Sequence, residues 1–331
     1  MIRNFYRRLR RGKDHPAAFL VRSCILVCFF VFSLVSCDES APQTVHAETP
    51  VPGPLETVRY LAAENLQVSP SPLIDPSEYP AEMRQIFERG SIIFGMTAAD
   101  QKPFFYTDES SGELIGLDVE IAYEIANRLG VRAEFNREAQ SFDGVVLKVF
   151  RKEVDVALSK LSRTMRRASL VRFTDPYITF RQGLLVNRLE LAKVSSEENL
   201  PVFIKNFQGS LAIIKNSSYV GYAAANFPEA IIKTYDTWGQ CVDALFAGEV
   251  LAAYRDEGEI LIINETREDA AILMKPVLIN DKQDPIAMAV SQDAPMLQEW
   301  INVFLAEYLL QHASDLHPAQ IVRRHFAKGA L

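Results

Sequence analysis

The fold is decided by the stretch Asp118-Val-Glu-Ile-Ala-Tyr-Glu-Ile-Ala-Asn-Arg-Leu-Gly-Val-Arg-Ala-Glu-Phe135. Its first part, residues 118–129, places apolar side chains at the spacing of one helix face. Gly130 follows as a stop, because glycine readily adopts the left-handed conformation that ends many helices. Residues 131–135 then alternate apolar and polar side chains, which predicts a strand. A helix that leads at once into a strand indicates an α/β fold.

Similar passages repeat along the chain and restart after Thr179. We expect strands at residues 91–96, 131–135, 154–158, 211–214 and 250–254, and helices at residues 118–129, 142–152, 219–226, 238–246, 257–264, 296–312 and 318–326. Strands that alternate with helices in this way predict largely parallel sheets flanked by helices.

The restart predicts two lobes of this α/β kind. We expect residues 83–184 and 287–331 to form lobe 1, and residues 185–286 to form lobe 2. The chain would cross between them in two extended segments, residues 182–187 and 285–290, and the last two helices would return to lobe 1. Open α/β sheets bind ligands beyond the carboxyl ends of their strands. The expected binding site is therefore the cleft between the lobes.

The N-terminal region predicts export. Residues 1–22 contain seven basic residues and one acidic residue, and residues 23–36 are almost wholly apolar. This apolar run is shorter than the roughly 20 residues of a membrane-spanning helix, and the preceding basic segment is typical of a signal peptide. The run ends in Leu34-Val-Ser-Cys37, which resembles the lipobox of bacterial lipoproteins. We expect cleavage after residue 36 and lipid on Cys37; the alternative is an uncleaved anchor. The protein would then lie on the periplasmic side of the inner membrane, or on the outer face of the cell membrane.

Residues 37–82 are expected to form a tether, because eight of the 17 prolines lie between residues 39 and 80. Without residues 1–36 the chain has a formal charge of −13, which argues against a nucleic-acid partner. The five His and four Cys residues lack the spacing of metal ligands. We therefore expect no metal site and no cofactor.

Several stretches follow one another in a set order between about Met83 and Phe326. They are Ile92-Ile-Phe-Gly95, Gly112-Glu-Leu-Ile-Gly-Leu-Asp-Val-Glu-Ile-Ala122, Ser162-Arg-Thr-Met-Arg-Arg167, Phe173-Thr-Asp-Pro-Tyr177 and Ala247-Gly-Glu-Val-Leu-Ala-Ala-Tyr254. Together they resemble the extracellular solute-binding proteins of family 3, the polar amino-acid receptors of ABC importers. The resemblance implies a two-lobed, periplasmic-binding-protein-like type II fold with a two-strand hinge. It also implies a monomer that captures an amino acid or related small carboxylate and delivers it to an ABC permease.

The resemblance assigns four residues to the ligand's α-carboxylate. Arg167 matches the arginine that grips this group, for which a guanidinium fork is suited because it donates two parallel hydrogen bonds. Ser162 matches the Ser or Thr beside it. Ser217 and Ser218 match the pair that opens the first helix of lobe 2, where free N–H groups attract an anion. The alternatives are a surface arginine and an ordinary N-cap serine. Asn216 replaces the usual glycine, and asparagine tolerates left-handed backbone.

The resemblance assigns Asp256 to the ligand's α-ammonium, although an aspartate at this position would also cap the helix that follows. Phe142 matches a position where the family often has an aromatic residue against the ligand's side chain; the alternative is an ordinary core phenylalanine. Phe104 is a candidate for the wall of the cleft. Lys160 departs from the family, which mostly has a small residue here. It either lies solvated at the rim or enters the cleft, where it would pair with Asp256 or favour an acidic ligand.

Two other functions remain open at this point. One is a sensing lipoprotein that reports its ligand to a membrane partner without transport. The other is a cyclohexadienyl-dehydratase-like enzyme on the same fold, for which Glu138 or Glu257 would be the general acid. No motif places either glutamate in a cleft, so we expect a binding protein rather than an enzyme.

The lipid anchor yields a first prediction. Cys37→Ala removes the thiol that would be acylated, so we expect this variant to lose lipid labelling and to leave the membrane fraction. Cys28→Ala, within the expected signal peptide, is the matched control and should keep both properties. Unchanged labelling and fractionation of Cys37→Ala would show that this cysteine is not the anchor.

Overall fold

The computed structural model describes residues 74–195 and 199–326. The expected signal peptide, Cys37 and most of the tether lie outside the described residues. The elements up to residue 187 are η2 (Pro76–Glu78), α1 (Ala81–Arg89), β1 (Ser91–Thr97), β2 (Tyr106–Thr107), β3 (Leu114–Ile115), α2 (Leu117–Leu129), β4 (Arg132–Ala139), α3 (Phe142–Phe150), β5 (Val156–Ala157), α4 (Met165–Ala168) and β6 (Val171–Asn187).

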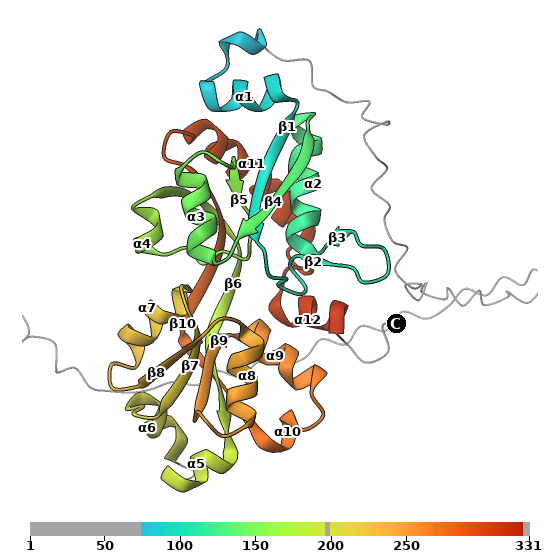
Figure 1. Cartoon of the computed structure of the whole chain (residues 1–331). Helices are drawn as coiled ribbons and strands as arrows, with labels where there is room; N and C mark the ends of the chain where they lie inside the picture. Colours follow the sequence, from blue (N-terminus) through green and yellow to red (C-terminus); the bar gives the residue numbers. More distant parts are fainter. Residues whose placement is uncertain (1–73, 196–198, 327–331) are drawn as a thin grey trace, which may run out of the picture. The chain divides into compact units, whose positions relative to one another are not determined.

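The second part contains further helices and strands (Figure 1). They are α5 (Arg188–Val194), α6 (Leu200–Lys205), β7 (Ser210–Ile214), α7 (Ser218–Asn226), β8 (Ile231–Tyr235), α8 (Trp238–Phe246), β9 (Ala252–Asp256), α9 (Glu257–Thr266), α10 (Ala270–Leu273), β10 (Met274–Ser291), α11 (Pro295–His312) and α12 (Pro318–Phe326). The expected α/β class is confirmed.

Two long antiparallel strands join the halves of the sheet. The strand order is β4-β1-β5-β10-β6-β9-β7-β8, with parallel pairs β1–β4 and β1–β5 on one side and β7–β8 and β7–β9 on the other. β6 and β10 pair along most of their 17 and 18 residues and run through both halves. The expected crossings at residues 182–187 and 285–290 are parts of these strands. We propose that the lobe boundaries lie where we expected them, near residues 184–185 and 286–287.

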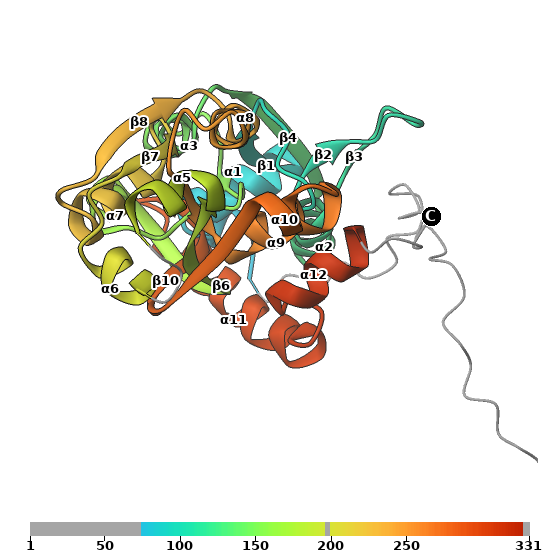
Figure 2. The ribbon, with the colours of Figure 1, turned by 90° about the horizontal axis from the view of Figure 1, so that it is seen from below.

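Alternation along β10 shows how helices cover both faces of these strands. Ile286, Met288 and Val290 belong to the core beneath α2 and α11, whereas Ala287 and Ala289 belong to the core beneath α3. Successive side chains of a strand point to opposite faces, so these two cores lie on opposite sides of the sheet. Figure 2 shows α3 and α8 on one side of β6 and β10 and α11 on the other. Lobe 2 has its own pair of cores, beneath α7 and α8.

The helices start and stop at identifiable residues. Ser141 accepts a hydrogen bond from the Gly144 backbone at the start of α3, and Gly130 ends α2 with φ of 70°. We did not expect β8, which is mostly exposed and whose sequence does not alternate. We also predicted only residues 182–187 of β6 as extended, whereas the strand begins at Val171 and contains Pro176; its pairing with β10 changes register on both sides of this proline.

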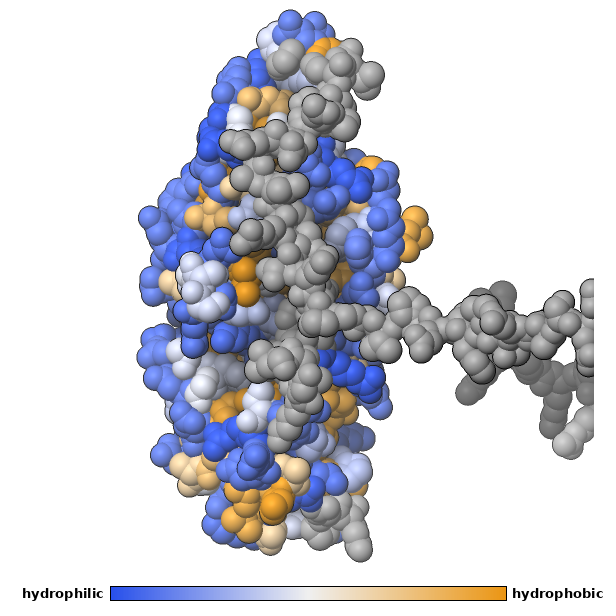
Figure 3. Space-filling view, turned by 90° about the vertical axis from the view of Figure 1, so that its right-hand side faces the viewer, coloured by the Kyte–Doolittle hydropathy of each residue, from blue (hydrophilic) through white to orange (hydrophobic). Residues whose placement is uncertain are grey.

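The face of the molecule drawn in Figure 3 is mostly polar. Figure 3 shows a face on which hydrophilic residues predominate, with smaller hydrophobic areas between them. Within residues 74–195 and 199–326, no helix combines the length and apolar character needed to cross a bilayer. The described residues also contain no cluster of three or more His, Cys, Asp or Glu side chains placed to hold a metal ion.

Candidate functional site

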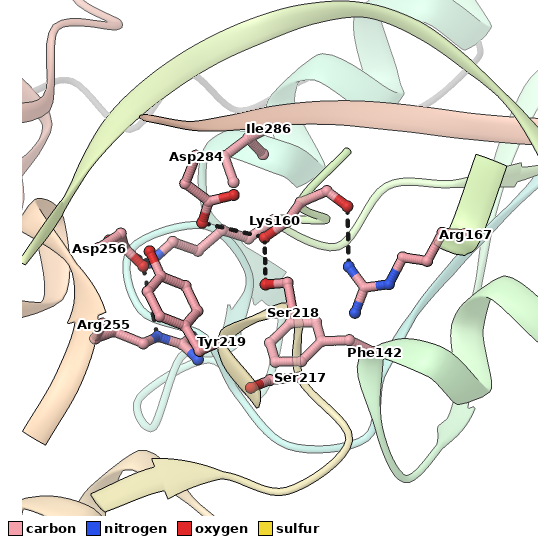
Figure 4. Close-up of a pocket in the computed structure, with 11 residues that line it drawn as sticks. Phe142, Lys160, Arg167, Ser217, Ser218, Tyr219, Arg255, Asp256, Asp284 and Ile286 are labelled. Carbon is pink, nitrogen blue, oxygen red and sulfur yellow. Dashed lines mark hydrogen bonds and ion pairs between the residues drawn. The ribbon is translucent and has the colours of Figure 1, made fainter. Parts of the chain in front are cut away.

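A small cavity lies between the two lobes (Figure 4). Of the eight ligand-binding residues expected from the sequence, seven line it: Phe142, Lys160, Ser162, Arg167, Ser217, Ser218 and Asp256. Tyr219, Arg255, Asp284 and Ile286 line it as well, and the sequence analysis did not select them. Its free volume is about 10 Å³, close to what one water molecule needs. A ligand of amino-acid size therefore enters only when the lobes separate.

The loop between β5 and α4 is fastened to β10. Ser162 forms an antiparallel bridge with Ile286, the Arg163 N–H donates to the Pro285 carbonyl at 2.8 Å, and the Ala287 N–H donates to the Leu161 carbonyl at 3.0 Å. These bonds fix the loop against the strand that crosses between the lobes.

Arg167 provides an unsatisfied donor at the cavity. Its guanidinium is 4% exposed; Nε donates to Asp143 Oδ1 at 3.0 Å and Nη1 donates to the Ser162 carbonyl at 2.9 Å. Its Nη2 is buried and has no hydrogen-bond partner. Burial lowers the pKa of Arg167, and Asp143 opposes that shift. A buried donor left unpaired costs free energy, which an acceptor on a ligand would recover.

The start of α7 faces Arg167 from lobe 2. Ser217 is the N-cap residue and Ser218 begins the helix, as expected. The Ser218 hydroxyl donates to the Ser162 hydroxyl at 2.9 Å, which joins the two lobes. Asn216 has φ of 54°, which confirms that asparagine keeps the left-handed turn expected at this position. Arg167 and the start of α7 thus form the side of the cavity that favours an anion.

Lys160 enters the site instead of lying at the rim. Its Nζ lies 3.1 Å from Asp256 Oδ2 and 2.7 Å from Glu259 Oε1, and all three side chains are buried. The ammonium also lies 4.9 Å from the ring centre of Phe104 and 5.3 Å from that of Phe180. Phe104 therefore encloses the lysine rather than lining the cavity. Burial acts to raise the pKa of Asp256, but Lys160 and Arg255 outweigh it and lower that pKa.

The backbone of Lys160 is held in an uncommon conformation. Its φ is 46°, a left-handed value that costs free energy in a non-glycine residue. Its N–H donates to Asp118 Oδ2 at 2.7 Å, and Tyr177 donates to the other oxygen of the same carboxylate at 2.8 Å. Asp118 is fully buried, and this burial raises its pKa to about 7 despite both bonds. The aspartate of the 112–122 stretch thus positions the lysine.

Asp256 lies both at the start of a helix and at the wall of the cavity. It caps α9 by accepting a hydrogen bond from the Glu259 N–H at 3.2 Å, and it lines the cavity. Its neighbour Arg255 is also buried, with Nε 3.4 Å from Asp256 Oδ2. The Arg255 guanidinium lies 5.6 Å from the ring centre of Phe142, which belongs to a core and lines the cavity at once. Lys160 and Arg255 together offset the charges of Asp256 and Glu259.

Asp284 on β10 is the second carboxylate that lines the cavity. It is 1% exposed and accepts hydrogen bonds from the hydroxyls of Ser162 at 3.1 Å and Tyr222 at 3.2 Å. No cation of the described chain lies within ion-pair distance of it. Burial and the nearby Asp256 raise its pKa to about 6. We did not predict it from the sequence, because the expected extended segment began at residue 285, one position later, whereas β10 begins at Met274.

Neither glutamate considered as a general acid lines the cavity. Glu138 is 73% exposed and pairs with Lys148, whereas Glu257 is buried and its Oε2 accepts a hydrogen bond from Arg181 Nε at 2.7 Å.

Residues 93–314 match the family model of the bacterial extracellular solute-binding proteins, family 3. The chain belongs to this family. The glutamine-binding protein GlnH of an ABC transporter from Bacillus subtilis is 25% identical over 224 residues, which cover 66% of this chain and 77% of GlnH. The arginine-binding periplasmic protein of Mannheimia haemolytica is 24% identical over 155 residues, which cover 46% of this chain and 59% of that protein.

Solved structures of similar proteins share the fold of this family 3 protein. A putative binding component of an ABC transporter from Wolinella succinogenes, complexed with lysine, has a TM-score of 0.60 at 24% identity, covering 73% of this chain and 97% of that one. An ancestral amino-acid-binding protein, a precursor of cyclohexadienyl dehydratase, has a TM-score of 0.58 at 24% identity, covering 74% and 99%. At this identity the likeness establishes the two-lobed architecture alone.

The interlobe ion pair yields a prediction for the ligand-free protein. Lys160→Met leaves Asp256 and Glu259 buried with one cation fewer, and a buried charge without its partner is strongly unfavourable. Because the lobes can separate and hydrate these groups, we expect the variant to have a larger radius of gyration than the wild type in small-angle X-ray scattering. Lys152→Met is the matched control, because Lys152 also has a left-handed φ of 61° but pairs with Asp293 at the surface. Identical scattering of all three proteins would contradict the prediction.

The raised pKa of Asp284 yields a prediction about stability. A carboxyl group whose pKa is higher in the folded protein stabilises the fold below about pH 4, and this contribution is lost as the pH rises through about 6. Asp284→Asn removes this titration while keeping the shape. We expect its free energy of unfolding to exceed that of the wild type by about 2 kcal/mol near pH 8 and to match it near pH 4.

Urea unfolding at both pH values measures this difference. Asp175→Asn, at an exposed position on the neighbouring strand β6, is the control and should follow the wild type. An Asp284→Asn variant that is less stable than the wild type near pH 8 would show that the carboxyl group of Asp284 does not have a raised pKa in the folded protein.

Proposed function

We propose that this family 3 protein captures an amino acid or related small carboxylate between its lobes and delivers it to an ABC permease. The observation that carries the proposal is the buried, unpaired Nη2 of Arg167, which lies beside Ser162, Ser218 and the start of α7. A carboxylate suits this site, because an anionic oxygen forms a strong charge-assisted hydrogen bond with the free Nη2 and the start of α7 favours a negative charge. The names of GlnH and of the arginine-binding relative support an amino acid.

We further propose that the protein acts as a lipid-anchored monomer through Cys37 on the outer face of its membrane. A tether rich in proline would separate the binding lobes from the bilayer and let them reach the permease. The ligand would bind the open form, and its contacts with both lobes would favour closure.

Arg167→Ala tests the proposal. Truncating a desolvated partner of a ligand carboxylate costs 2–5 kcal/mol in comparable sites, so we expect binding to weaken by roughly 30-fold or more. The probes are the proteinogenic L-amino acids, beginning with arginine, glutamine and lysine, and calorimetric titration of the purified chain measures their affinity. A thermal-shift screen identifies the binding ones first, because a ligand at 100 times its dissociation constant adds about 2.7 kcal/mol of stability.

Arg166→Ala is the matched control. Arg166 contacts the same carboxylate, Asp143, but its side chain is 81% exposed and does not line the cavity. It should leave the affinity within about twofold of the wild type, given the small contribution of exposed ion pairs. Near-native affinity in Arg167→Ala would mean that the ligand carboxylate does not bind at this arginine.

A further inference from the structure

The two carboxylates that line the cavity differ in their partners. Asp256 has the ammonium of Lys160 at 3.1 Å and the guanidinium of Arg255 at 3.4 Å. Asp284 is as deeply buried, but no cation of the described residues lies within ion-pair distance of it. It accepts hydrogen bonds from the hydroxyls of Ser162 and Tyr222, and Tyr219 and Arg255 also favour its charged form. A buried carboxylate without a cation is costly. Asp284 is therefore the group in the cavity that a ligand cation would stabilise most.

A ligand ammonium at Asp256 would have to displace Lys160. That ammonium bridges Asp256 and Glu259 and lies over the rings of Phe104 and Phe180. The backbone bond from Lys160 to Asp118 holds the residue in place. Displacement would break two buried ion-pair contacts to form one. The position that the family assigns to the ligand's ammonium is thus already occupied by a side chain of this protein.

Asp284 and Arg167 both form a hydrogen bond with Ser162. Arg167 donates to the Ser162 carbonyl, and the Ser162 hydroxyl donates to Asp284. In Figure 4, Ser218 lies between Asp284 and Arg167. The Ser218 hydroxyl donates a hydrogen bond to the Ser162 hydroxyl. Arg167 and Asp284 are therefore linked through Ser162, and the charge of Asp284 also acts on Arg167. An α-amino acid carries its carboxylate and its ammonium on one carbon atom, so it presents two opposite charges close together to the two sides of the cavity.

We propose that Asp284, rather than Asp256, accepts the ammonium group of an α-amino acid whose carboxylate binds at Arg167. This inference rests on the proposed function and assigns a specificity role to a residue of the hinge strand β10. When the lobes are together, Lys160 pairs with Asp256 and Glu259 and occupies the position that the family assigns to the ligand's ammonium. The ligand class is a zwitterionic α-amino acid.

The test compares each amino acid with the analogue that has hydrogen in place of its α-amino group. Asp284→Asn should weaken binding of the amino acid by roughly 30-fold or more. The affinity of Asp284→Asn for the analogue should stay within about threefold of the wild-type value, because the analogue has no ammonium group that could bind to Asp284. Asp256→Asn is the matched variant and should weaken both members of a pair by similar, smaller factors. Thermal melting of both variants without ligand shows that they fold.

The possible results distinguish a failure of the role proposed for Asp284 from a failure of the proposed function, on which that role rests. Loss of amino-acid binding in Asp256→Asn, with a near-native Asp284→Asn, would overturn the inference and leave the proposed function standing. An equal loss for both members of each pair in Asp284→Asn would also overturn it, because the role would then be structural. Wild-type protein that binds the analogues but none of the amino acids would overturn the ligand class. Wild-type protein that binds neither set would overturn the proposed function itself.

Discussion

The antiparallel pairing of β6 with β10 is the constraint on which the rest of the structure depends. These strands belong to the cores of both lobes, so their register fixes how the two lobes are joined. β10 also bonds to the loop that carries Ser162, and it carries Asp284 itself. The same backbone hydrogen bonds therefore fix where the chain crosses between the lobes and how far Ser162 lies from Asp284. A one-residue slip would turn Asp284 to the other face of the sheet.

The charges of the cavity account for its small volume. Lys160 from lobe 1 bonds to Asp256 and Glu259 from lobe 2, and Ser162 bonds to Ser218 across the same gap. These contacts let the lobes approach each other through groups of the protein alone. A ligand binds to the open arrangement, so its apparent affinity is reduced by the fraction of molecules that are closed. Lys160 thus influences both the position available to a ligand and the equilibrium between the two arrangements.

Family membership accounts for the fold, whereas the charges inside the cavity bear on which ligand it binds. Membership follows from residues 93–314 and accounts for two α/β lobes with a binding site between them. It does not fix the ligand, because relatives with named ligands differ among themselves and Lys160 departs from the family pattern. The pairing of buried charges distinguishes Asp256, whose charge is matched, from Asp284, whose charge is not.

The sequence by itself determined many of the helices and strands and seven of the eleven residues that line the cavity. Helices such as α2 and α8 follow from apolar spacing with a cap or a glycine stop, because these signals are local. Arg167, Ser162, Ser217, Ser218 and Asp256 follow from motif positions within short segments. The tertiary structure alone decided the length of β6 and β10, whose pairing is non-local and tolerates Pro176. It also decided the partners of Lys160 and Asp284. Lys160 and Glu259 are far apart in the chain, and only the packing of two lobes determines which buried charge is neutralised and which is left for a ligand.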